Sequence, residues 1–127
     1  MPRIYHVDVA QHVAAADARW VDNLISRFAI PGVEGTGRGS SRRLTLGAVQ
    51  HIALVRSLTT SLGLPLTQAV PIAMSLLGSS PPAEVTVGPW LRVTFERDGF
   101  LQYVDELIAD GVESLAPTRR GRPPALR

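Results

Sequence analysis

The amino-acid sequence predicts a mainly α-helical chain of the α+β class, and three observations predict it. Apolar residues recur at helical spacing along most of the chain, glycine and proline interrupt them at short intervals, and one stretch alternates with the two-residue period of a strand. With 127 residues, 45% of them hydrophobic, the chain can bury one core. We expect about four helices, followed by a small β-hairpin and a C-terminal helix.

Two short helices are expected at the start of the chain. Asp8, followed three residues later by Gln11, has the spacing of a capping box for the first helix. Asp17 offers a second N-cap after a gap of about three residues, which is the connection of a helix-turn-helix. The second helix presents apolar residues at helical spacing, namely Val21, Leu24, Ile25 and Phe28.

A glycine-rich segment follows the second helix. Ile30-Pro31 ends that helix, because a residue before proline disfavours the helical conformation. Residues 32–41 contain four glycines and two serines and lead into Arg42 and Arg43. We interpret this segment as a glycine-rich loop or short hairpin with a basic second arm, in other words a wing.

Two further helices are expected after the wing. Thr45 caps a helix that Gly63 closes, and a fourth helix lies within residues 65–77. Pro71 leaves two alternatives for the fourth helix, a late start or a kink. The expected buried line of the third helix is Val49, Ile52, Val55, Leu58 and Leu62.

A small β-hairpin and a last helix are expected beyond a proline-containing hinge. Residues 84–87 and 90–95 alternate as strands do, on either side of Gly88-Pro89. Asp98 is expected to cap the last helix. The apolar stripe of that helix consists of Leu101, Val104, Ile108, Val112 and Leu115.

Charge divides the chain into three parts that its formal net charge of +2 conceals. All 13 basic residues are arginine. Residues 1–77 contain seven arginines and four acids, residues 78–116 two arginines and seven acids, and the tail 117–127 four arginines and no acid. We expect a winged helix-turn-helix domain over 1–77, a hairpin and helix unit over 83–116, and a disordered tail. The basic parts predict a surface that binds a polyanion.

Several function classes are excluded or disfavoured. Cysteine is absent, which excludes disulfides, thiolate catalysis and metal sites built on thiolates. The three histidines, His6, His12 and His51, are dispersed and complete no catalytic triad, so we expect no enzyme, cofactor or metal. The first residues lack an apolar signal core and no run reaches ~18 apolar residues, so we expect a cytoplasmic protein at the bacterial nucleoid.

The arrangement over residues 4–77 resembles the DNA-binding domain of MerR-type transcription regulators. The matching segments are Asp8–Ala10, Val21–Phe28, Ile30-Pro31 and Gly39–Thr45, followed by Val49, Ile52, Leu58, Gly63 and Leu66. Thr45 stands where the family has an aromatic residue after the wing arginine. The resemblance implies a winged helix-turn-helix fold, sequence-specific binding of double-stranded DNA and regulation of transcription.

The second helix, residues 17–28, is expected to enter the major groove. Arg19 could bond a guanine edge and Asn23 an adenine edge, while wing arginines meet phosphates or the minor groove. The alternatives are a merely solvated helix face and wing arginines that pair with acids. Trp20 is interpreted as core packing. The candidate DNA-binding residues of helix and wing are Arg19, Asn23, Ser26, Arg27, Arg38, Arg42 and Arg43.

The tail holds a second DNA-binding signal. Arg120-Gly121-Arg122-Pro123 matches the core of an AT-hook, in which Arg120 and Arg122 would lie in a narrow minor groove. The alternative is an ordinary basic tail that adds non-specific phosphate affinity.

We expect a homodimer that places two recognition helices on two half-sites, with residues 83–116 as the candidate dimer or partner contact. A small-molecule effector is not identifiable from the sequence. The alternative function is an architectural or excisionase-like protein that bends DNA. A third hypothesis is a protein-interaction adaptor whose helix-turn-helix does not contact DNA.

Overall fold

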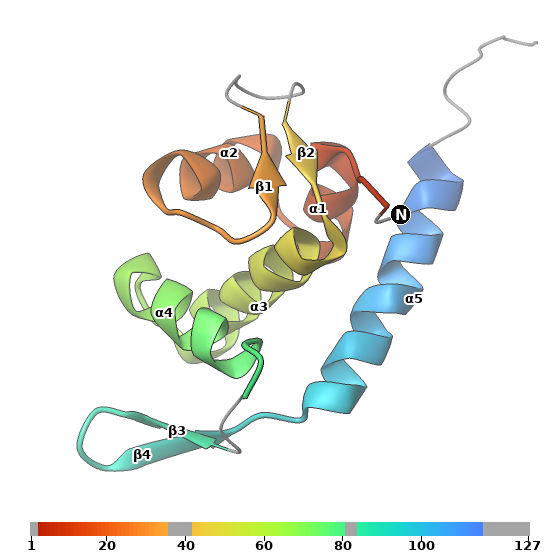
Figure 1. Ribbon diagram of the computed structural model, residues 1–127. Helices are drawn as coiled ribbons and strands as arrows, with labels where there is room; N and C mark the ends of the chain where they lie inside the picture. The colour runs from red at the N-terminus through yellow and green to blue at the C-terminus, as the bar shows by residue number, and fades with distance from the viewer. Residues whose placement is uncertain (1–2, 36–41, 81–83, 116–127) are drawn as a thin grey trace, which may run out of the picture.

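The computed structural model describes residues 3–35, 42–80 and 84–115 (Figure 1). Within these residues the chain is mostly helical, with two antiparallel sheets of two strands each, which confirms the expected α+β class. The helices are α1 (Val7–Ala14), α2 (Ala18–Arg27), α3 (Leu46–Leu62), α4 (Leu66–Leu76) and α5 (Arg97–Leu115). The strands are β1 (Val33–Glu34), β2 (Arg43–Leu44), β3 (Glu84–Val87) and β4 (Leu91–Thr94). None of the described helices is both long enough and apolar enough to cross a membrane.

The buried side chains form one apolar cluster around α3. This helix packs against α1, α4 and α5, and α1 also packs against α2 and α5. Val49, Ile52 and Val55 of α3 are fully buried, as expected, whereas Leu62 is 48% exposed and does not extend the buried line. Leu62 is the last residue of α3, and the chain turns away at Gly63.

The caps of α1 and α2 are local side-chain contacts. His6, not Asp8, caps α1, because its Nδ1 accepts a hydrogen bond from the Asp8 N–H at 3.3 Å. The predicted cap at Asp8 is therefore wrong, and Asp8 lies in the first turn, where its charge favours the helix dipole. Asp17 caps α2 as predicted: its Oδ1 accepts the Trp20 N–H at 2.8 Å. Ala15, with φ 54°, turns the chain between the two helices.

The hairpin of β1 and β2 is tied into the core from both sides. Val33 pairs with Leu44, whose side chain is fully buried. Tyr5 adds a bridge on the other edge of β2: its N–H donates to the Leu44 carbonyl at 2.7 Å, and the Leu44 N–H donates back at 3.0 Å. Gly32 permits the turn into β1, because its φ is 89° and a Cβ there would lie 2.1 Å from Thr45 Oγ1. The expected hairpin is thus present in the described residues.

Helices α3 and α4 follow the predicted start and stop signals. Thr45 Oγ1 accepts the Ala48 N–H at 3.3 Å, and Gly63 closes α3 with φ 70°. Helix α4 begins directly after Pro65 and continues through Pro71, so the alternative of a late start is wrong. Pro71 is exposed, on the side of α4 away from the core.

The second hairpin and α5 complete the described chain. Strand β4 is shorter than the predicted 90–95, because Trp90 belongs to the turn. Helix α5 begins at Arg97, and the Phe100 N–H donates to the Glu96 carbonyl at 2.9 Å, so Asp98 lies in the first turn and is not the cap. The Arg97 guanidinium donates to the Leu76 carbonyl at 3.0 Å and thereby satisfies the end of α4.

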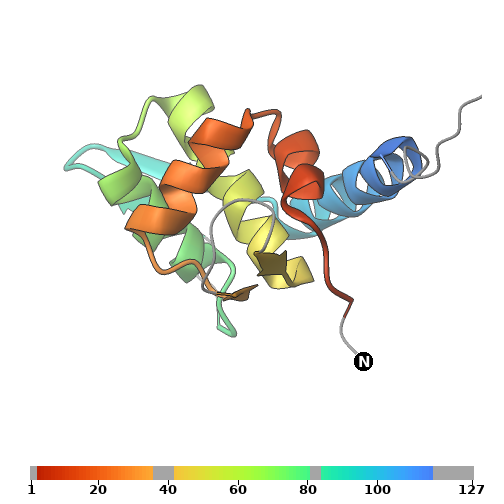
Figure 2. The same ribbon diagram turned by 90° about the horizontal axis from the view of Figure 1, so that it is seen from above.

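Helix α5 belongs to the same core as the first four helices. Its Val104 and Ile108 are buried in that core, and Figures 1 and 2 place α5 alongside α1. His12 Nε2 lies 2.7 Å from Asp110 Oδ2 across this contact. Gly111 allows the close approach, because a Cβ there would lie 2.9 Å from the His12 ring. Of the unit expected over 83–116, only the hairpin projects from the helical body (Figure 1).

Candidate nucleic-acid interface

Helix α2 presents a polar face to solvent and an apolar face to the core. Val21 and Leu24 are fully buried, whereas Arg19, Asn23 and Ser26 are exposed. Because an α-helix has 3.6 residues per turn, positions 19, 23 and 26 share one face. The structure therefore brings these three predicted residues together on the solvent side of α2.

Two further arginines are exposed, one on α2 and one on the β1–β2 hairpin. Arg27 is exposed at the end of α2, where its guanidinium lies 5.3 Å from the centre of the Phe28 ring. Arg43 is exposed on β2, opposite Glu34 in the hairpin register. Figure 1 shows α2 and the β1–β2 hairpin side by side at one end of the molecule, and the ion pair described next joins them.

Arg42 has a different place from the one predicted. Its side chain is only 9% exposed, and its Nη1 donates to Asp22 Oδ1 at 2.7 Å. Its Nη2 donates to Ser26 Oγ at 3.2 Å. The structure thus supports the alternative interpretation for Arg42, a wing arginine paired with an acid, and not an outward phosphate contact. The contact fixes the start of β2 against α2.

Asp22 is the residue of this surface that sequence reasoning missed. Its side chain is 41% exposed and lies on the same side of α2 as Arg19 and Ser26. Helical spacing places Asp22 one turn before Ser26 and so on the same face of α2. Its partner Arg42, however, is 20 residues away in sequence. Only the folded hairpin brings the two charges together.

Trp20 connects α2 to the core and to α3. Its half-buried ring packs against the core, as interpreted from the sequence, and the Arg56 guanidinium of α3 lies 4.8 Å from the ring centre. The guanidinium also donates to the Ala15 carbonyl at 3.5 Å. A surface hollow of about 630 Å³ runs along the outer side of α2 and is lined by Asp17, Arg19, Trp20, Asp22, Asn23 and Ser26.

Three predicted DNA-binding residues lie outside the described residues. Arg38 falls in 36–41, and Arg120 and Arg122 fall in 116–127. The described part of the candidate interface consequently consists of Arg19, Asn23, Ser26, Arg27 and Arg43, with Asp22 and Arg42 as the pair that joins helix and hairpin.

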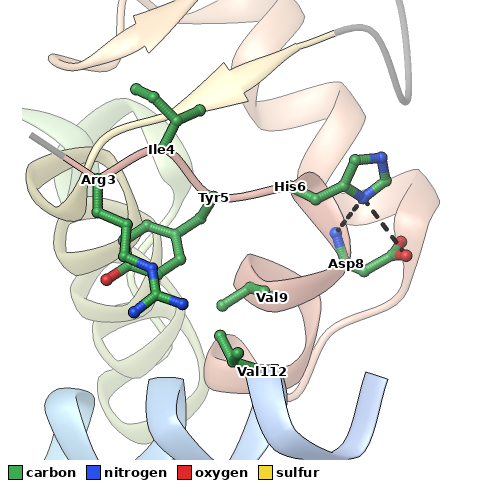
Figure 3. A pocket seen from close by; sticks show the side chains of 7 residues that line it. All are labelled: Arg3, Ile4, Tyr5, His6, Asp8, Val9 and Val112. Carbon is green, nitrogen blue, oxygen red and sulfur yellow. Dashed lines mark hydrogen bonds and ion pairs between the residues drawn. The ribbon is translucent and has the colours of Figure 1, made fainter. Parts of the chain in front are cut away.

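A second hollow, of about 370 Å³, lies between the N-terminal segment, α1 and α5 (Figure 3). Val9 and Val112 point toward each other across it, and the Arg3 guanidinium lies 5.4 Å from the centre of the Tyr5 ring. His6 Nδ1 lies 3.3 Å from Asp8 Oδ2, while His12 pairs with Asp110 instead. No group of three potential metal ligands occurs among the described residues.

No protein-family model matches the chain, and comparisons with curated proteins and with solved structures gave no significant match. The proposed function therefore rests on the geometry and charge of the described residues.

Proposed function

We propose that the protein binds double-stranded DNA sequence-specifically and regulates transcription as a winged helix-turn-helix protein. The observation that carries this proposal is the outward face of α2, where exposed Arg19, Asn23 and Ser26 stand on a helix anchored by fully buried Val21 and Leu24. The β1–β2 hairpin, clamped to α2 through Arg42, supplies the wing.

The dimensions of α2 suit a major groove. An α-helix with its side chains is about 10–12 Å across and the major groove of B-DNA is about 12 Å wide, so α2, about 15 Å long for its 10 residues, can lie in the groove. In this arrangement Arg19 forms two hydrogen bonds with a guanine edge, and Asn23 does the same with an adenine edge. Ser26 already receives a hydrogen bond from Arg42 and still has its own hydroxyl proton to donate.

The remaining exposed arginines position the protein rather than read bases. Arg27 is exposed at the end of α2 and Arg43 on the wing, and in the proposed complex both contact phosphates. Arg38 and the arginines of the tail would add to this electrostatic term. Arg42 acts differently, because its guanidinium holds the wing in a fixed orientation against α2.

The order of elements favours a MerR-type domain within the winged class. Two short helices, a hairpin and two further helices follow one another in the described chain, as in the family that the sequence resembles. Within this proposal, α2 is the recognition helix and α3 and α4 form the support behind it.

The proposal is tested by capturing genomic DNA with the full chain and with three arginine variants. Arg19→Ala is expected to lose about 1–3 kcal/mol of discrimination at one base position, and Arg43→Ala to weaken binding at all sequences alike. Arg92→Ala is the control for the loss of one positive charge outside the candidate interface, because Arg92 is 75% exposed on the opposite hairpin; on a duplex with a single half-site, which one copy of the chain occupies, it should bind as the wild type does.

The outcomes separate the alternatives. Enriched sites that bend strongly in a circular-permutation gel, without an effect on neighbouring genes, would favour the architectural DNA bender. Absence of salt-sensitive binding to any duplex would contradict DNA binding altogether and favour a protein-interaction adaptor.

A further inference from the structure

Asp22 is an acid on the face of α2 that we propose to meet DNA. Its side chain is 41% exposed, and it lines the hollow along the outer side of α2 together with Arg19, Asn23 and Ser26. An acid at this place is unexpected, because the phosphates of DNA repel a negative charge. The role of Asp22 therefore depends on what compensates its charge and on what its oxygens can bind.

Arg42 compensates the charge of Asp22. Its Nη1 donates to Asp22 Oδ1 at 2.7 Å, and only 9% of the Arg42 side chain is exposed. The carboxylate and the guanidinium together add no net charge to this part of the surface. The repulsion that an isolated carboxylate meets near phosphates is thereby reduced, so Asp22 can enter a groove of DNA together with its neighbours on α2.

The hydrogen-bonding character of Asp22 is fixed by its ionised carboxylate. Such a group accepts hydrogen bonds at about four lone-pair positions and donates none. The bond from Arg42 occupies one of these positions at Oδ1, and the 41% of the side chain that is exposed leaves room for a further donor. Asp22 can therefore bind only a part of a base that carries an N–H group.

The major groove offers such donors at two bases, N4 of cytosine and N6 of adenine. Adenine presents its N7 acceptor beside N6, and a carboxylate repels N7 and leaves it without a donor. Cytosine presents its amino group without an acceptor beside it on the same base. Guanine and thymine present only acceptors and so oppose a carboxylate. Cytosine is therefore the base that best fits an aspartate at this position.

We propose that Asp22 is a specificity-determining residue, which accepts a hydrogen bond from N4 of a cytosine in the major groove while Arg42 neutralises and orients its carboxylate. This inference rests on the proposed binding of DNA through α2, and it adds a base contact to those proposed for Arg19 and Asn23. It also gives Arg42 an effect on sequence preference: the buried guanidinium must receive an oxygen, which decides which atom of residue 22 points to the DNA.

Selection of binding sites from a pool of random duplexes, with the full chain, tests this assignment. At one position of its site the wild type should favour cytosine over each other base about tenfold, the usual effect of one wrong base pair. Asp22→Ala should lose this preference and keep the preferred bases at all other positions. Circular dichroism checks that each variant is folded.

Asp22→Asn tests the role of Arg42 in orienting the side chain. The amide oxygen is expected to accept the hydrogen bond from Arg42, so that the amide NH2 group points to the DNA. Thymine O4, an acceptor, occupies the place of cytosine N4 in the major groove, so the preference should change from cytosine to thymine by about tenfold. When Asp22→Asn is combined with Arg42→Met, the amide can turn either way, and cytosine and thymine should be bound alike. A residue that only held the wing would weaken binding to all sequences without exchanging one base for another.

Asp8→Asn is the matched control, because it makes the same substitution at a 57% exposed aspartate of α1 and leaves the outer face of α2 intact. It should leave the preferred base at every position unchanged. A wild type that enriches no sequence would contradict the proposed function and this inference together. Specific sites that keep the same preferred bases in Asp22→Ala and Asp22→Asn would overturn the role of Asp22 alone and leave the proposed DNA binding in place.

Discussion

The two hairpins of this molecule differ in the length of their paired strands and, in the opposite sense, in their contacts with the rest of the protein. The β1–β2 hairpin has two paired residues in each strand, yet Leu44 is fully buried, Tyr5 bonds one edge and Arg42 binds α2. The β3–β4 hairpin has four paired residues in each strand, yet its tip residue Trp90 is 90% exposed. Contacts outside a hairpin, and not the hydrogen bonds between its own strands, therefore decide how firmly it is held.

The largest expected effect follows from the unequal burial of a leucine in each hairpin. Leu44→Ala should lower the free energy of unfolding by about 2–5 kcal/mol, because a fully buried leucine leaves a cavity. Leu91→Ala should lower it by less than about 0.5 kcal/mol at concentrations where the chain is monomeric. Denaturant unfolding followed by circular dichroism measures both. Equal losses would contradict the inference that the β1–β2 hairpin is held more firmly than the β3–β4 hairpin.

A second test uses a glycine with positive φ at each hairpin. Gly32→Ala is expected to cost about 2–3 kcal/mol, because its new Cβ displaces the Thr45 hydroxyl that caps α3. Gly88→Ala should cost only about 1 kcal/mol, since its φ is unfavourable for alanine but no atom lies within 4 Å of the new Cβ. Thermal unfolding measures the two values. A Gly88→Ala loss as large as that of Gly32→Ala would mean that backbone strain, not the contact with Thr45, dominates.

The ion pair that joins β2 to α2 should have a smaller effect on stability. Arg42→Met is expected to cost about 1 kcal/mol, because Asp22 is 41% exposed and water can replace the lost partner. A double-mutant cycle with Asp22→Asn isolates the interaction between the two side chains. Within the DNA-binding proposal, Arg42→Met also weakens binding without changing the number of phosphate contacts. If Arg42→Met instead reduced the slope of log affinity against log salt as Arg43→Ala is expected to do, Arg42 would contact a phosphate directly.

The smallest effect on stability is expected at the exposed arginine of each hairpin. Arg43→Ala and Arg92→Ala should both leave the free energy of unfolding within about 0.5 kcal/mol of the wild type. They should differ in binding to a duplex with a single half-site, which one copy of the chain occupies: the slope of log affinity against log salt falls by about one for Arg43→Ala and stays unchanged for Arg92→Ala. Fluorescence anisotropy over a salt series measures the slopes. Equal slopes in the two variants would remove Arg43 from the interface.

Local chemistry explains what could be predicted from the sequence. The caps at Asp17 and Thr45 and the end of α3 at Gly63 depend on residues within one helical turn, so their patterns were sufficient. The error at Asp8 is also local: the ring nitrogen of His6 accepts the hydrogen bond, and histidine is not among the usual capping residues.

Contacts between distant segments explain what could not be predicted. The burial of Arg42 requires α2 and β2 to meet, and the docking of α5 requires the two ends of the described chain to meet. Within the candidate interface, the exposed face of α2 followed from helical periodicity, whereas the role of Asp22 depended on the fold. The 90% exposure of Trp90 likewise depends on the tertiary structure, and the strand-like pattern of the neighbouring residues did not predict it.

The contact between α1 and α5 has a consequence for biosynthesis. His12 meets Asp110 across 98 positions of the chain, so a ribosome must add a further 98 residues after His12 before the two helices can pack. At about 5–20 residues per second, this takes roughly 5–20 seconds, during which the side of nascent α1 that faces α5 has no partner. That interval is when a chaperone that binds apolar segments would act, and synonymous codons between the two helices would lengthen or shorten it.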